Sequence, residues 1–137
     1  MKYVFVSESI ILLFAVFLLS ITVTPGEAFA EDMLDNKMFV IKISEQGKEG
    51  ESFDDELTFK EGTFFSSDCE QYGFGSAPYK ATSEGKKTMF ESTLVSENEG
   101  KALWNGTVDG DKISGTFVWS KEGQDPLNYS FEGSLRK

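Results

Sequence analysis

Apolar and polar residues alternate along most of the chain between positions 37 and 135, and this period of two predicts β-strands. The clearest example is the stretch 101–120, KALWNGTVDGDKISGTFVWS. Its two arms alternate on either side of Asp109-Gly110, and an Asp-Gly pair between alternating segments is a strong signal for a β-hairpin. Both arms place their apolar side chains on one face, so we expect this hairpin to cover a core.

The same pattern predicts eight strands in all. Besides the two arms of 101–120, they are expected at 37–44, 55–60, 63–67, 79–83, 87–96 and 127–135. Hairpin-length turns join them except near 45–54 and 68–78, and no segment shows an apolar stripe at helical spacing. This organisation predicts an all-β fold, an antiparallel up-and-down β-barrel of about eight strands. Gly106, Gly115 and Gly133 fall on the inward face, where glycine permits sharp coiling or leaves room for a ring such as Trp104.

Residues 1–30 have the features of a secretory signal peptide. An apolar run from Ile10 to Val23 follows Lys2, and Ala28-Phe29-Ala30 provides a cleavage site after Ala30. The run is shorter than the roughly 20 residues that a membrane-spanning helix needs. We therefore expect a signal helix at 1–30, a single domain at 31–137, export to the periplasm or the exterior, and no membrane association after cleavage.

Charge and composition exclude several functions. The formal net charge of −10 disfavours nucleic acids and anionic membranes as partners. A basic protein partner is compatible with this charge, and a role in solubility alone also explains it. The chain has no histidine, which removes the usual general base and the commonest metal ligand. We expect no catalytic residues, no metal and no cofactor, and therefore a protein that is not an enzyme.

The single cysteine, Cys69, does not change this expectation. It lies between Asp68 and Glu70, whose negative charges raise the pKa of a thiol and suppress the reactive thiolate. One cysteine cannot form an internal disulfide, so a buried thiol is expected, with a bridge between two chains as the alternative.

The spacing Trp104-x-Gly106-x-Val108-x-Gly110, followed by Ile113-x-Gly115-Thr116-x-x-Trp119 and by Tyr129-x-Phe131-x-Gly133-x-Leu135, resembles small exported bacterial barrels of the calycin group, both lipocalin-like and avidin-like. The resemblance covers most of the domain and implies a closed antiparallel barrel. The Gly-x-Trp opening of lipocalins is missing from the first strand, so the resemblance implies a fold and identifies no ligand.

The least regular part of the domain is 68–78, DCEQYGFGSAP. Aromatic walls with a few polar groups are typical of small-molecule pockets. The candidate ligand-binding residues in and around this segment are Ser66, Asp68, Tyr72, Phe74, Tyr79, Trp104 and Trp119. The alternative is that the segment closes the barrel with its own aromatic rings and that both tryptophans belong to the core, donating their indole N–H groups to loop carbonyls.

Two functions follow. The first is an exported, non-enzymatic, monomeric barrel that binds a small apolar or aromatic ligand at the end covered by 68–78. The alternative is a cell-envelope inhibitor or interaction protein whose acidic surface, for instance a protruding loop at 45–55, attracts a basic protein partner. An interior filled by Trp104, Phe117 and Phe131 would argue against ligand binding.

Overall fold

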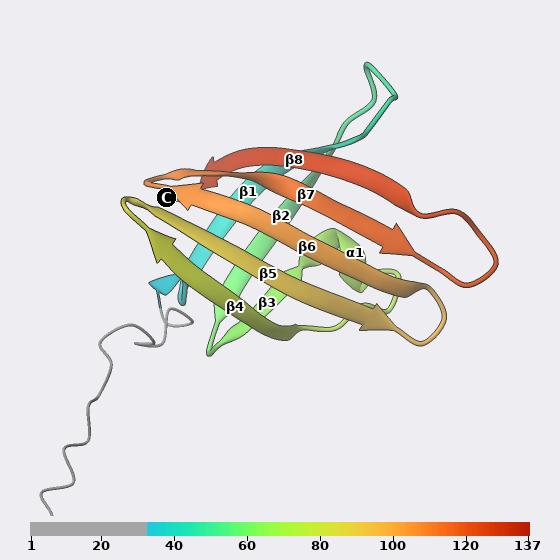
Figure 1. Cartoon of the computed structure of the whole chain (residues 1–137), viewed down its shortest axis with the longest axis horizontal. Coiled ribbons are helices and arrows are strands. Elements are labelled where there is room, and N and C mark those ends of the chain that lie inside the picture. The colour runs from blue at the N-terminus through green and yellow to red at the C-terminus, as the bar shows by residue number, and fades with distance from the viewer. Residues whose placement is uncertain (1–32) are drawn as a thin grey trace, which may run out of the picture.

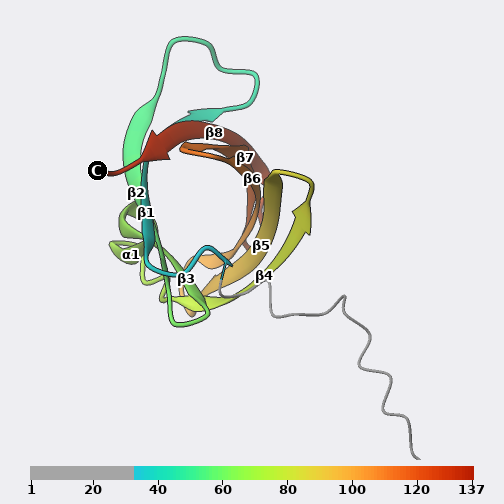
Figure 2. The same ribbon diagram turned by 90° about the vertical axis from the view of Figure 1, so that its left-hand side faces the viewer.

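The predicted barrel is confirmed. The computed structural model describes residues 33–137, so the signal peptide predicted at 1–30 lies outside the described residues. The elements are β1 Lys37–Glu45, β2 Phe53–Lys60, β3 Thr63–Ser66, α1 Ser67–Glu70, β4 Ala77–Glu84, β5 Lys87–Ser96, β6 Gly100–Asp109, β7 Lys112–Ser120 and β8 Leu127–Leu135. Each strand pairs antiparallel with the next, and β8 pairs with β1, so the sheet closes (Figure 2).

The two ends of the barrel differ. One end carries the connections 46–52, 67–76, 97–99 and 121–126, and we call it the pocket end (Figure 1). The opposite end carries the short turns 61–62, 85–86 and 110–111, together with residues 33–36 and the C terminus. Within residues 33–137, no helix has the length and apolar character needed to cross a membrane.

The predicted hairpin at 101–120 is confirmed, with its two-residue turn at Gly110-Asp111, one residue after the expected Asp109-Gly110. Asp109 pairs with Lys112 across the turn, and Gly110 has a φ of +60°, a conformation that glycine adopts without strain. Trp104 pairs with Phe117, so two large rings meet on the inward face. The closed barrel buries this face, as the alternation of the two arms predicts.

The middle of the barrel is filled by aromatic rings. Trp104 is fully buried and stacks on Phe117 with ring centroids 4.2 Å apart, and its ring lies 5.2 Å from that of Phe131. Phe59 contacts four further rings, those of Phe39, Phe64, Tyr79 and Phe90. Trp104, Phe117 and Phe131 therefore fill the interior, which counts against ligand binding at the level of these rings, because no room for a ligand is left there.

Two of the three inward glycines make room for phenylalanine rather than for Trp104, while Gly133 lies against the backbone of β1. A β-carbon on Gly106 would overlap the ring of Phe90 and lie 3.1 Å from the ring of Phe131. One on Gly115 would overlap the backbone of Asn105 and lie 2.7 Å from the same Phe131 ring. The strands coil closely at these positions, as expected from the sequence.

The seam between β3 and β4 is the least complete in the sheet. These strands pair only at Thr63 with Pro78 and at Phe64 with Ala77, whereas β5 and β6 pair at ten positions. The chain between them makes the one-turn helix α1, which the apolar pattern did not predict, and then a loop across the pocket end. The helix begins because the Ser66 side chain accepts a hydrogen bond from the Cys69 amide at 3.2 Å.

Candidate ligand-binding site

A pocket of about 360 Å³ lies at the pocket end, beneath α1 and the loop that follows it. This volume is near the lower limit of the range usual for small-molecule sites. Six of its ten lining residues are aromatic, and the full set is Phe53, Asp68, Cys69, Tyr72, Phe74, Glu99, Ala102, Phe117, Trp119 and Tyr129. The pocket lies at the end of the filled interior, since Phe117 contributes both to the core and to the lining.

The aromatic lining continues the packed core. Trp104 stacks on Phe117, and Phe117 stacks in turn on Tyr129 with a centroid distance of 4.5 Å and an interplanar angle of 12°. Phe53 meets Tyr129 edge to face at 6.4 Å. Burial and the nearby Glu45 carboxylate raise the pKa of the Tyr129 hydroxyl, so this group stays neutral and can donate a hydrogen bond at ordinary pH.

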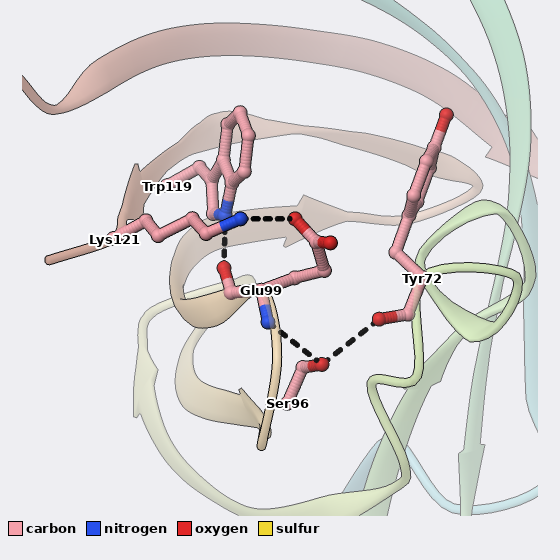
Figure 3. Close-up of polar contacts among 5 residues, drawn as sticks. All are labelled: Tyr72, Ser96, Glu99, Trp119 and Lys121. Carbon is pink, nitrogen blue, oxygen red and sulfur yellow. Dashed lines mark hydrogen bonds and ion pairs between the residues drawn. The ribbon is translucent and has the colours of Figure 1, made fainter. Parts of the chain in front are cut away.

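Hydrogen bonds hold the rim of the pocket in place (Figure 3). The Trp119 indole N–H donates to the Glu99 carbonyl oxygen at 2.5 Å, and Lys121 pairs with the Glu99 carboxylate at 3.1 Å. The Ser96 hydroxyl donates to the Tyr72 carbonyl at 2.8 Å and accepts from the Glu99 amide. The loop after α1 is thus attached to the β5–β6 turn by its backbone, while Tyr72 as a whole remains 55% exposed.

A buried carboxylate supports α1 from beneath. Asp55 is only 6% exposed, and its two oxygens accept hydrogen bonds from the Ser66 hydroxyl at 2.5 Å, the Asp68 amide at 2.8 Å and the Glu56 amide at 2.7 Å. Burial raises the pKa of Asp55, and these three donors oppose the shift. Asp55 was not selected from the sequence as a site residue, although its alternation with Leu57 and Phe59 places it on the inward face.

Cys69 lines the pocket but is a poor nucleophile. Burial is the main reason that the pKa of its thiol rises to about 11, and the carboxylates of Asp55 and Asp68 add to the shift. The raised pKa of this thiol is as expected from the sequence, but burial rather than the flanking charges is its main cause. The thiol is half-buried and free.

The structure brings four of the seven candidate residues into the pocket: Asp68, Tyr72, Phe74 and Trp119. The other three do not line it. Ser66 is fully buried against Asp55, and the Tyr79 hydroxyl donates to Asp35 at 2.7 Å, near the β2–β3 turn of the opposite end. Trp104 belongs to the core, and its indole nitrogen is buried without a partner within residues 33–137, so the expected bond to a loop carbonyl forms for Trp119 and not for Trp104.

Six lining residues were not selected from the sequence as ligand-binding residues: Phe53, Cys69, Glu99, Ala102, Phe117 and Tyr129. Phe117 and Tyr129 carry the inward alternation of their strands, which places them inside the barrel without indicating which end they occupy. Their position along the barrel axis depends on strand register.

A second hollow lies on the outside of β1, β2 and β5–β8. It is larger, about 880 Å³, and more open, and no aromatic residue lines it. Its charged residues have both signs, including Lys42, Lys112, Asp109 and Glu132. It lacks the apolar enclosure typical of a small-molecule site. Among residues 33–137, no group of three or more metal-ligating side chains could hold a metal ion.

Comparisons of the chain with protein-family models, with curated proteins and with solved structures find no match. The fold and the site together define a class: a closed eight-stranded antiparallel β-barrel with an aromatic-lined pocket at one end. This architecture is consistent with a calycin-like fold.

Proposed function

We propose that the protein is a non-enzymatic binding barrel, exported to the periplasm or the exterior, that holds a small apolar or aromatic ligand in the pocket beneath α1 and the following loop. The observation that carries the proposal is the lining, with six aromatic side chains around about 360 Å³. The leader-like residues 1–30 and the resemblance to exported bacterial calycins support export.

The filled core limits the ligand to a shallow position. Trp104, Phe117 and Phe131 occupy the middle of the barrel, so a ligand rests on Phe117 and Tyr129 rather than entering a deep cavity. A flat ring fits such a site, because aromatic pairs gain about 0.5–1.5 kcal/mol beyond simple burial.

Binding of N-phenyl-1-naphthylamine, a neutral aromatic dye whose fluorescence rises in apolar surroundings, tests the proposal. We expect saturable binding by the wild type and a dissociation constant about five- to tenfold higher for Tyr72→Ala, because this ring covers the pocket. The free energy of unfolding should change by less than about 0.5 kcal/mol, since most of the ring is exposed and the Tyr72 carbonyl still accepts from Ser96.

Leu103→Ala is the matched control. Leu103 is 42% exposed on the outer side of β6 and does not line the pocket, so dye affinity should not change. A wild type that does not bind the dye, or a Tyr72→Ala variant with unaltered affinity, would contradict the proposed site. A loss of several kcal/mol in Tyr72→Ala would show that this ring is structural instead.

The second candidate function is an interaction protein for a basic partner, and the β1–β2 loop favours it. Residues 46–52 extend away from the barrel (Figure 1) and are exposed throughout. The loop carries Glu49 and Glu51, while its Lys48 pairs with Glu45. Capture of a basic envelope protein should then weaken with rising salt and with Glu49→Gln and Glu51→Gln together; capture that ignores both changes rules this function out.

A further inference from the structure

The charged residues that line the pocket have one sign. Asp68 and Glu99 are its only charged lining residues, and both carry carboxylates. Within residues 33–137, no lysine or arginine lies within ion-pair distance of Asp68, whose carboxylate accepts a hydrogen bond from the neutral Gln71 side chain at 2.6 Å. Asp68 therefore presents an uncompensated negative charge at the pocket.

Glu99 adds less negative charge to the pocket than Asp68 does, because its carboxylate is paired with a lysine, but it lies among the aromatic rings of the lining. Lys121 pairs with its carboxylate, and both side chains are about one-third exposed. In the view of Figure 3, the Glu99 carboxylate lies between the rings of Trp119 and Tyr72, which line the same pocket. The pocket thus combines carboxylates with tryptophan and tyrosine rings.

Both kinds of group favour a positive ligand. The face of an aromatic ring attracts a cation within about 6 Å, most strongly for tryptophan, and sites that recognise quaternary ammonium groups are built from such rings. The carboxylates add Coulomb attraction, which is stronger in a partly enclosed pocket than in water. A negatively charged ligand would meet the carboxylates of Asp68 and Glu99, of which only Glu99 is paired with a cation, Lys121.

We propose that the pocket selects small organic ammonium ions: ligands with an apolar or aromatic body and a positively charged nitrogen placed among Trp119, Tyr72 and the Asp68 carboxylate. This inference rests on the proposed binding function and specifies the chemical class of its ligand. The apolar body lies against Phe117 and Tyr129, and the charge lies at the rim.

Three phenols of nearly the same shape separate charge from size. They are 4-tert-butylphenol, its cationic isostere (4-hydroxyphenyl)trimethylammonium, and the anion 4-hydroxybenzenesulfonate. Isothermal titration calorimetry at low salt should give the tightest binding for the cation, about tenfold tighter than the neutral phenol, and the weakest for the sulfonate. Added salt should reduce the advantage of the cation and leave the neutral phenol unaffected.

Asp68→Asn tests the charge directly, since asparagine can still accept the hydrogen bond from Gln71. We expect this substitution to lower the affinity for the cation about threefold and to leave the affinity for 4-tert-butylphenol unchanged. Glu91→Gln, an exposed carboxylate on the outer side of β5 that does not line the pocket, should change neither affinity.

The outcomes separate the two proposals. If the cation and the neutral phenol bind within twofold of each other, or if Asp68→Asn leaves all three affinities unchanged, the inference of cation selectivity is overturned while the binding function stands. If the wild type binds none of the three phenols and does not bind N-phenyl-1-naphthylamine, both proposals fail.

Discussion

Asp55→Ala should lower the free energy of unfolding by about 3 kcal/mol. The change removes the acceptor of three hydrogen bonds, leaving the Ser66 hydroxyl and the amides of Glu56 and Asp68 without it. Each buried donor that loses its partner costs about 1–3 kcal/mol, and relief from burying the carboxylate offsets part of the sum. Urea unfolding followed by tryptophan fluorescence measures the loss.

The effect should also reach the pocket. Asp55 holds the Asp68 amide and, through Ser66, the first turn of α1. Amide exchange in 67–74 should therefore accelerate in Asp55→Ala more than exchange in β5 and β6. A variant with wild-type stability and unchanged exchange would show that water replaces the carboxylate at no cost.

Asp55→Asn is the conservative control and gives the pH dependence. Its side-chain oxygen can still accept from both amides, so we expect a smaller loss, about 1 kcal/mol.

Because burial raises the pKa of Asp55 in the folded state, the folded protein holds this proton more tightly than the unfolded chain does. The resulting stabilisation is complete below the ordinary pKa of about 3.9 and is lost as the pH rises through the raised value. Relative to Asp55→Asn, the wild type should be more stable in acid than at neutral pH; the opposite slope would contradict the assigned direction.

Gly133→Ala should lower the free energy of unfolding by about 3 kcal/mol or more. Gly133 lies in β8 opposite Ile41 of β1, in the strand pair that closes the barrel. A β-carbon there would overlap the Val40 carbonyl oxygen and lie 2.7 Å from the Cα of Ile41. These are backbone atoms, so the overlap can be relieved only by separating the two strands, which weakens their hydrogen bonds.

Gly75→Ala is the matched control for Gly133→Ala. Gly75 lies in the loop before β4, and a β-carbon there would meet no atom within 4 Å. Its stability should stay within about 0.5 kcal/mol of wild type. Thermal and urea unfolding of both variants measure the difference, and a Gly133→Ala protein as stable as Gly75→Ala would show that β1 and β8 can separate freely.

The fold could be predicted from local information. Period-two alternation specifies which side chains face inward, and the Asp-Gly pair at 109–110 predicts that β6 and β7 form a hairpin, although the turn itself falls at Gly110-Asp111. Eight such strands in sequence have few ways to satisfy their edges other than closure. The short α1 was missed because one turn of helix has no apolar period, and only its Ser66 cap marks its start.

The site was less predictable, because it depends on register around the closed sheet. Trp104 and Trp119 alternate in the same way in one hairpin, yet Trp104 pairs with Phe117 in the core while Trp119 pairs with Ala102 near the pocket. Sequence shows which face a strand residue occupies, but its height in the barrel is decided by the stagger of all eight strands.

The sequence by itself determined the barrel, its inward face and the segment that covers one end. Only the tertiary structure decided that the Ser66 hydroxyl donates to Asp55, that the Tyr79 hydroxyl donates to Asp35, and that a pocket remains beside the packed rings. The physical reason is that strand pairing is a contact between neighbours, whereas a pocket is the space left after residues from four strands, α1, the loop after it and the β5–β6 turn have packed together.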